Sequence, residues 1–245
     1  MPLTDAQIEH YRTQGFAIGG RILSAAELER LRDEIDVLIA ALPEGQLPEN
    51  MPSAHYENEC FRDLFLSDRL VDVAEQVLGP DVALFTSYII SKRPEVGLAV
   101  DWHQDAAFFP IEPMETFTLW LAVDDSDARN GCMRVIPGSH QARRVFTHRV
   151  DTQSGTTLPL SLDDIDISKA IDIELGAGEY SVHDPFILHG SNPNTSVLRR
   201  CGITIKYIPT HVAIDRGFVA RTGFDWKNIR VYHARGNRGQ NTYAN

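Results

Sequence analysis

The sequence predicts a mainly β fold, an antiparallel sandwich or barrel, with helices flanking it on the N-terminal side. The first third of the chain carries helical patterns, and the rest carries short β-branched and aromatic runs separated by turn residues. Because long helices do not alternate with these runs, a doubly wound parallel sheet is not expected. The chain has 245 residues, 43% of them hydrophobic, which is enough to bury a sizeable core.

Three helices are predicted before residue 80. Two of them begin with a capping box, in which an N-cap side chain and the third helical residue bond reciprocally. These pairs are Thr4 with Gln7 and Ser24 with Glu27. The helix after Ser24 carries a one-faced apolar stripe that stops at Pro43, and a third helix is expected from Ser67 to Gly79. The segment 44–60 between them is predicted to be a loop that covers a pocket.

Strands are predicted from residue 81 onward. They span 82–90, 116–123, 132–136, 170–175, 179–183 and 201–208. The polar stretch 151–169 is predicted to be a long inserted loop. We expect a single domain over residues 1–245, with a helical part at about 1–80, a β core at about 81–210 and a C-terminal segment at 211–245 that could close over a site.

The net charge of −11 argues against nucleic acid or an anionic membrane as a partner, because phosphate binding rests on Lys and Arg. No apolar run approaches the roughly 20 residues that a membrane helix needs. The N-terminus lacks the basic and apolar regions of a secretory signal, so a cytoplasmic location is expected. Three scattered cysteines form no C-x-x-C pair and are expected to be reduced thiols.

The motif His-x-Asp at residues 103–105 is the first indication of chemistry. Residues two apart on a strand point to the same face, so His103 and Asp105 would aim at one point. His189 is the best candidate for a third ligand. Two histidines and one carboxylate leave three metal positions open, which suits non-haem Fe(II) oxygenases better than zinc. A lone His-x-Asp pair also arises by chance, so further residues must support the site.

Arg200 supplies that support, because it follows His189 by eleven residues and stands at the start of a predicted strand. A cosubstrate with a distal carboxylate needs a charged partner, and an arginine offers two parallel hydrogen bonds. Arg199 would face the other way on the same strand. Periodicity alone does not choose between the two arginines.

These segments together resemble the phytanoyl-CoA dioxygenase family of Fe(II)- and 2-oxoglutarate-dependent oxygenases. The matching stretches are 102–105 with 108–110, 130–140, and 189–194 with Arg200. The resemblance implies a double-stranded β-helix, which is a distorted, cupin-like jelly roll. It also implies Fe(II), 2-oxoglutarate and O2 as cofactor and cosubstrates, with His103, Asp105 and His189 as iron ligands. It favours Arg200 over Arg199 for the C5 carboxylate of 2-oxoglutarate.

The resemblance extends to other site residues. Ser191 matches a family position that contacts the same carboxylate, and Trp120 matches an aromatic residue that lines its pocket. Lys92 falls near a family lysine, with a solvated lysine at a strand end as the alternative. The candidate substrate walls are Tyr88, Phe108, Phe109 and Met133, together with the loops 43–60 and 147–169. A solvated surface is the favoured interpretation of Arg134, Arg143, Arg144 and His148, and recognition of an acid substrate is the alternative.

The activity implied by the resemblance is hydroxylation of an unactivated C–H bond in a small molecule, such as a specialised metabolite or small acid, with release of succinate and CO2. Because Asp105 is present, halogenation is not expected. Desaturation, epoxidation or ring formation remain open. A cupin-like metal enzyme would not need Arg200, and a non-catalytic jelly-roll module would predict a damaged set of ligands. The sequence selects neither the substrate nor the oligomeric state.

Overall fold

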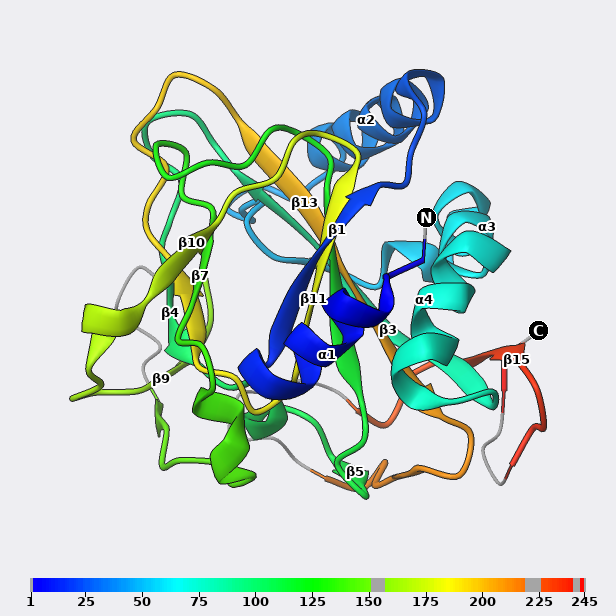
Figure 1. The fold of residues 1–245 in the computed structure, drawn as a ribbon. Coiled ribbons are helices and arrows are strands. Elements are labelled where there is room, and N and C mark those ends of the chain that lie inside the picture. The colour runs from blue at the N-terminus through cyan, green and yellow to red at the C-terminus, as the bar shows by residue number, and fades with distance from the viewer. Residues whose placement is uncertain (1, 151–156, 219–225, 240–242, 245) are drawn as a thin grey trace.

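Two antiparallel sheets lie face to face, and helices from the first third of the chain cover the outer face of the larger sheet (Figure 1). This computed structural model describes residues 2–150, 157–218, 226–239 and 243–244. Neither sheet closes on itself. The predicted class, mainly β with flanking helices, is confirmed.

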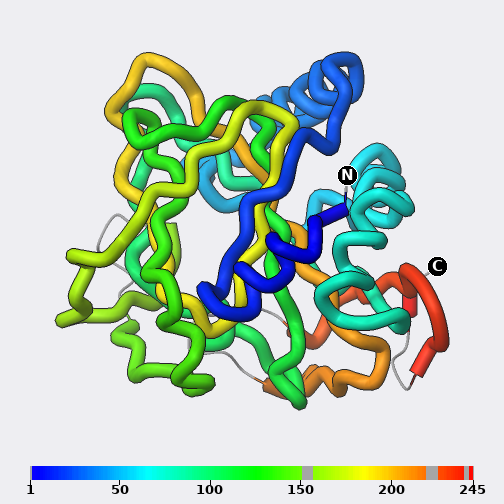
Figure 2. The backbone as a smooth tube through the Cα atoms, viewed as in Figure 1, coloured from blue at the N-terminus to red at the C-terminus, as the bar shows by residue number. Residues whose placement is uncertain are grey.

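The larger sheet has seven strands. Six of them follow one another in the order β1 (Phe16–Arg21), β11 (Glu179–His183), β6 (Phe117–Ala122), β13 (Arg200–Pro209), β3 (Val82–Lys92) and β15 (Tyr232–Arg235), and β2 (Met51–Pro52) pairs with β3. Figure 2 shows β1, close to the blue N-terminus, running beside the yellow β11 from late in the chain. Long-range pairing of this kind joins the N-terminal part to the β core.

The smaller sheet has four strands. Their order is β10 (Ile171–Ile173), β7 (Met133–Val135), β12 (His189–Ser191) and β4 (Val100–His103). Two short strand pairs lie outside these sheets. They are β5 (Ile111–Glu112) with β14 (Ala213–Ile214), and β8 (Arg149–Val150) with β9 (Leu160–Ser161).

Four α-helices precede the β core, and short 3-10 turns interrupt the loops. They are α1 (Asp5–Gln14), α2 (Ala25–Ala40), α3 (Glu59–Phe65) and α4 (Asp68–Leu78), with turns η1 (Ala54–Tyr56), η2 (Asp105–Ala107), η3 (Ser139–Ala142) and η4 (Ile167–Lys169). Both predicted capping boxes form, at Thr4 and at Ser24. Helix α3 was not predicted, because seven residues are too few for a periodic signal; it forms by burying Phe61 and Phe65, one turn apart.

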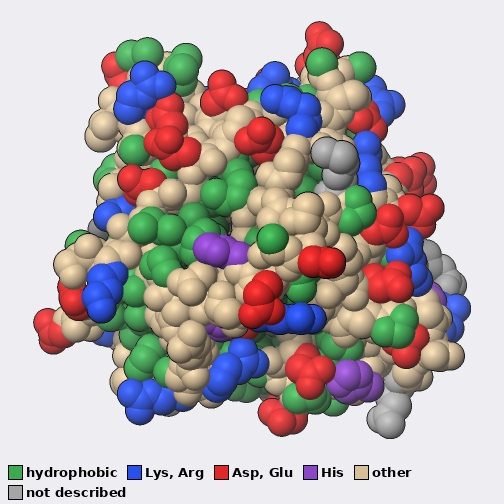
Figure 3. Space-filling model, viewed as in Figure 1, with side chains coloured by type: hydrophobic (Ala, Val, Ile, Leu, Met, Phe, Trp, Pro, Cys, Tyr) green, Lys and Arg blue, Asp and Glu red, His purple; other side chains and the backbone are tan. Residues whose placement is uncertain are grey.

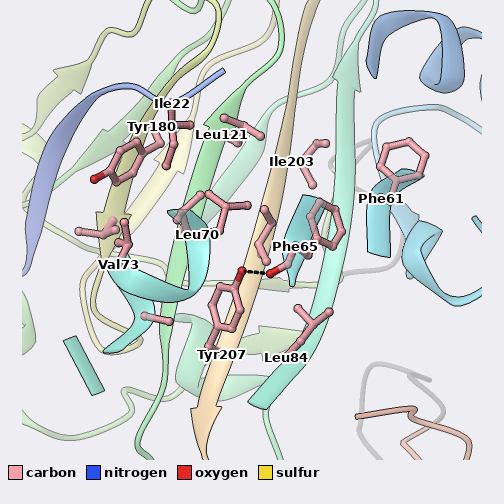
Figure 4. Packing of buried hydrophobic residues seen from close by; sticks show 14 of the residues in the cluster. Ile22, Phe61, Phe65, Leu70, Val73, Leu84, Leu121, Tyr180, Ile203 and Tyr207 are labelled. Atoms are coloured by element: carbon pink, nitrogen blue, oxygen red, sulfur yellow. Dashed lines mark hydrogen bonds between the residues drawn. The ribbon is translucent and has the colours of Figure 1, made fainter. Parts of the chain in front are cut away.

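Side chains alternate between the two faces of the central strands and so contribute to two hydrophobic cores. On β6, Phe117, Leu119 and Leu121 pack toward the helices, whereas Trp120 and Ala122 pack between the sheets. Figure 4 shows the helix-side core, where residues of α3, α4 and the sheet interdigitate. Burying this apolar surface is the main stabilising contribution.

Tyr207 of β13 ties this core to α3. Its hydroxyl donates a hydrogen bond of 2.6 Å to the carbonyl oxygen of Phe65, the last residue of the helix (Figure 4). Carbonyls at a helix C-terminus have no partner within the helix, so the bond satisfies a buried acceptor. It fixes α3 against the middle of the larger sheet.

The surface in Figure 3 carries interspersed acidic and basic side chains rather than one basic face. Among the described residues, no helix combines the length and apolar character that crossing a membrane requires. Part of the C-terminal segment packs on the core, where Trp226 stacks on Phe85 with ring centroids 5.7 Å apart. Residues 219–225, and with them the middle of the segment expected to close over the site, lie outside the described part of the chain.

Candidate active site

The three predicted metal ligands meet at the edge of the smaller sheet. His103 ends β4 and His189 begins β12, and the two residues are direct cross-strand partners. The nearer carboxylate oxygen of Asp105, Oδ1, lies 3.8 Å from Nε2 of His103 and 4.0 Å from Nε2 of His189. All three residues are buried, and their ligand atoms lie within 4.8 Å of one another.

The secondary structure that carries Asp105 differs from the prediction. His103 and Asp105 were expected on one strand face, but β4 ends at His103 and Asp105 opens the turn η2. The chain turns there because the amides of Ala107 and Phe108 bond back to the carbonyls of Gln104 and Asp105. The convergence of the two side chains therefore comes from a strand end followed by a turn.

Each imidazole is oriented by the backbone carbonyl two residues before it in the chain. His103 Nδ1 donates to the carbonyl of Asp101 at 2.7 Å, and His189 Nδ1 donates to that of Ile187 at 3.1 Å. A carbonyl only accepts, so these bonds fix the tautomer and leave each Nε2 lone pair facing the centre. Burial lowers the pKa of His103 to about 3 and of His189 to about 4, so both rings are neutral at pH 7.

Asp105 is held by its outer oxygen. Thr118 Oγ1 donates to Oδ2 at 2.5 Å, while His183 Nε2 lies 3.5 Å and Lys206 Nζ 3.9 Å from the same atom. Burial alone would raise the pKa of Asp105, but Lys206 and the neighbouring imidazoles hold it well below its usual range. The carboxylate is therefore ionised, and Oδ1 stays available on the histidine side.

This donor set fits a divalent iron. Two neutral imidazoles and one anionic carboxylate on one side of a metal ion leave the opposite side open. Hydrogen bonds behind each of the three ligand residues supply the orientation that metal sites require. Within the described part of the chain, it is the one group of three His, Cys, Asp or Glu residues with such spacing.

A cavity of about 760 Å³, counted out to its open mouth, extends from these three residues. All four predicted substrate-wall residues line it, as do Trp120, Ser191 and Arg200. The loops 43–60 and 147–169, also predicted as walls, contribute Asn50, Thr157 and Leu158. Sequence reasoning missed a further group of lining residues: Ile90, Val100, His183, Gly190, Thr204 and Lys206. Asn50 comes from the segment 44–60 that was expected to cover a pocket.

One end of the cavity is strongly positive. Arg200 is only 2% exposed, and its guanidinium lies 4.3 Å from the ring centre of Trp120. Lys92 is the cross-strand partner of Arg200, and its ammonium donates to Ser191 Oγ at 2.7 Å and to the carbonyl of Asn192. Among the described residues, neither cation has a carboxylate within 4.0 Å. A buried guanidinium without a counter-ion, with a second basic side chain beside it, favours the binding of an anion.

The pKa values reflect this uncompensated charge. Burial, and then the charge of Arg200, lower the pKa of Lys92 to about 6. Burial lowers the pKa of Arg200 to about 10, so the guanidinium remains protonated at pH 7. An incoming dicarboxylate would supply the missing negative charge.

The two adjacent arginines face opposite sides of β13. Arg199 pairs with Asp36 and, at 2.8 Å, with Asp124 on the outer surface, whereas Arg200 points into the cavity. Trp120 lies flat beside Gly202, where an added Cβ would come within 2.2 Å of the ring. A glycine at position 202 therefore makes room for the tryptophan next to Arg200.

Several other candidates lie away from the cavity. Lys92 does not line it and reaches it through Ser191. Arg143 pairs with Asp184 at 2.9 Å, and Arg134 pairs with Asp172 at 3.0 Å. The side chains of Arg144 and His148 do not line it either. Arg143 and Arg144 are exposed, as the surface interpretation predicts, whereas Arg134 and His148 are half-buried.

Comparison with known proteins identifies the family. The sequence profile of the family described as phytanoyl-CoA dioxygenase matches residues 11–201, which is more than half of the chain. The chain belongs to this family. The predicted family is thus confirmed, and with it the class of 2-oxoglutarate-dependent non-haem iron dioxygenases.

Two curated relatives illustrate the range of the phytanoyl-CoA dioxygenase family. A probable alpha-ketoglutarate-dependent hypophosphite dioxygenase of Stutzerimonas stutzeri is 32% identical over 168 residues, which cover 66% of this chain and 57% of that protein. An ectoine dioxygenase of Halomonas elongata is 29% identical over 224 residues, covering 80% of this chain and 67% of that protein. The matched stretch is thus under two thirds of the first relative's length.

A solved structure of the non-haem monooxygenase ThoJ in its apo form has the same fold. It superposes with a TM-score of 0.77 at 24% identity, covering 95% of this chain and 85% of that one. The predicted jelly-roll architecture is confirmed by this likeness and by the two antiparallel sheets.

Proposed function

We propose that this protein uses Fe(II), 2-oxoglutarate and O2 to hydroxylate a C–H bond of a small molecule, releasing succinate and CO2. The observation that carries the proposal is a single cavity that joins a buried His-Asp-His set to a buried arginine without a counter-ion. A site with only the metal-binding set would serve many metal enzymes. The arginine adds a requirement for a bound acid.

In this proposal, His103, Asp105 and His189 hold the iron through two Nε2 atoms and Oδ1. The carbonyls behind the imidazoles, and Thr118 behind the carboxylate, keep these atoms directed at the ion. Bound iron with 2-oxoglutarate would supply the oxidant that inserts one oxygen atom of O2 into a C–H bond. The protein itself contributes orientation and a shielded site.

The cosubstrate would lie with its C5 carboxylate at the positive end of the cavity. Arg200 offers two parallel donors to this carboxylate, and Ser191 adds a hydroxyl. Lys92 holds the Ser191 hydroxyl in place at 2.7 Å, and a bound carboxylate would raise the lowered pKa of Lys92 and favour its charged form. Trp120 forms the flat wall on which the guanidinium rests.

The substrate would occupy the aromatic side of the cavity. Tyr88, Phe108, Phe109 and Met133 line it together with Leu158. These apolar walls exclude water from the reacting centre, which protects the protein from unproductive oxidation. Tyr88 and Met133 come from strands β3 and β7, and Phe108, Phe109 and Leu158 come from loops.

The proposal also covers the domain organisation, the class of substrate and the location of the protein. We expect a single domain, from the helical part through the jelly-roll core to the C-terminal segment, because the helix-side core and the sheet are continuous. A small-molecule substrate and a cytoplasmic location are part of the proposal. Both agree with the acidic net charge of −11.

Succinate formation tests the proposal directly. The protein is incubated with Fe(II), 2-oxoglutarate and O2, and succinate is measured with and without a panel of small acids and metabolites. We expect slow iron-dependent succinate release that a true substrate accelerates. A protein that binds iron at these residues and yet releases no succinate under any condition would refute the proposed oxidation.

A further inference from the structure

Lys206 is a buried cation that the proposed iron and 2-oxoglutarate sites do not use. Its side chain is 4% exposed and lines the cavity. Among the described residues its ammonium makes no hydrogen bond, and its nearest carboxylate oxygen, Oδ2 of Asp105, lies 3.9 Å away. That oxygen already accepts a hydrogen bond from Thr118 at 2.5 Å. The ammonium therefore has donors left for a molecule in the cavity.

The position of Lys206 follows from strand alternation. Arg200, Thr204 and Lys206 all line the cavity from β13, and the odd-numbered residues between them face the helices. Lys206 lies six positions after Arg200 on the strand, which places their Cα atoms roughly 20 Å apart. The cavity thus has a basic side chain at each end of one strand face, with His103 and His189 on the facing sheet and Asp105 on the turn η2.

The surroundings of Lys206 are aromatic. Its ammonium lies 5.3 Å from the ring centre of Tyr88 and 5.6 Å from that of Phe109. Both rings belong to the wall where the substrate is expected, away from Arg200. Apolar surroundings strengthen an interaction between an ammonium and an anion, because little water competes for either charge.

We propose that the primary substrate carries a carboxylate and that Lys206 binds it. This inference rests on the proposed function, which assigns the opposite end of the cavity to 2-oxoglutarate. With a metal dication on Oδ1 of Asp105, the charge of that carboxylate is compensated, and Lys206 can pair with a second anion. The carbons next to the acid group of the substrate then lie at the reacting end of the cavity.

Matched acids and amides test the inference by binding rather than by turnover. Protein loaded with Zn(II) and saturating 2-oxoglutarate is titrated by calorimetry with three pairs: acetate and acetamide, hexanoate and hexanamide, 3-phenylpropionate and 3-phenylpropionamide. At least one acid is expected to bind roughly tenfold or more tightly than its amide. Lys206→Met should weaken that acid roughly 10- to 100-fold and leave its amide unchanged, as expected for a charged hydrogen bond.

Two variants serve as controls. Lys206→Arg keeps the charge and is expected to restore part of the preference for the acid. Lys169→Met removes an exposed lysine of η4 and is expected to change nothing. The proposal is overturned when no acid of the set is preferred over its amide, or when the preference survives in Lys206→Met. Loss of Zn(II) binding in Lys206→Met would also overturn it, because Lys206 would then only position Asp105.

The same titrations distinguish failure of the proposed function from failure of the Lys206 proposal. If the wild-type protein does not bind 2-oxoglutarate but still prefers an acid in a Lys206-dependent way, the cosubstrate assignment fails and the acid site stands. If 2-oxoglutarate binds and no acid is preferred, the proposed function stands and the acid site fails.

Discussion

Replacing Asp105 with alanine is expected to abolish 2-oxoglutarate turnover. Asp105 is the single anionic member of the proposed ligand set, and without it two neutral imidazoles remain to hold a dication. Metal catalysis supplies several kcal/mol, so succinate release should fall by at least about 1,000-fold. Fe(II) affinity should fall as well, which is measured by titration with a metal indicator under anaerobic conditions.

Asp101→Ala is the matched control, because this aspartate lies on the same strand two residues before His103. Its backbone carbonyl is the acceptor for His103 Nδ1, and alanine retains that carbonyl. Among the described residues, the Asp101 carboxylate lies within 4.8 Å of no group that could complete a three-residue metal set. Metal affinity and turnover should be close to wild type. Normal succinate release by Asp105→Ala would show that the carboxylate is not a ligand.

Replacing Arg200 with alanine is expected to weaken 2-oxoglutarate binding severely without removing the metal. Hydrogen bonds to a charged group contribute up to about 3 kcal/mol, which corresponds to a roughly 150-fold increase in Kd. The measurement is a calorimetric titration of 2-oxoglutarate into Zn(II)-loaded protein. Zn(II) affinity should not change, since Arg200 contacts Trp120 and Ser126 rather than the three ligands.

Arg199→Ala separates binding from stability. This arginine pairs with Asp36 and Asp124 outside the cavity, and its side chain is 26% exposed. Losing partly exposed ion pairs costs up to about 1 kcal/mol, or roughly 2–4 °C in Tm for a chain of this size. We therefore expect a lower Tm and an unchanged Kd for 2-oxoglutarate. An unchanged Kd in Arg200→Ala would contradict the assignment of the cosubstrate end.

Much of the fold was predictable because its local signals agree with its long-range packing. The capping boxes at Thr4 and Ser24 form as predicted, and β11 has the predicted bounds of 179–183. Helix α3 was missed because burial of Phe61 and Phe65 against the sheet, rather than helical periodicity, stabilises it. The order of strands in the two sheets is a long-range property that no local pattern specifies.

The site was predictable where the order and spacing of the motifs along the chain match those of a known family. His103, Asp105, His189 and Arg200 do converge on one cavity, although Asp105 lies on a turn. The sequence resemblance, not periodicity, favoured Arg200 over Arg199, and the structure shows the two facing opposite sides.

Lys206 and His183 were missed for different reasons. Lys206 shares the alternation of Arg200 along β13, so the signal was present but unused. His183 lies 3.5 Å from Oδ2 of Asp105 and lines the cavity. Its place there depends on the pairing of β11 with β6, which puts it beside Thr118. No local pattern around His183 indicates that pairing.

The central claim is that the iron ligands and Arg200 form one site for Fe(II) and 2-oxoglutarate. Absorbance of the Fe(II)-loaded protein under anaerobic conditions tests it most directly, because a chelated 2-oxo acid gives a weak visible charge-transfer band. We predict that the band appears on adding 2-oxoglutarate, is absent in Asp105→Ala, and requires much higher cosubstrate concentrations in Arg200→Ala. Iron-loaded wild-type protein that shows no band with saturating 2-oxoglutarate would contradict the account.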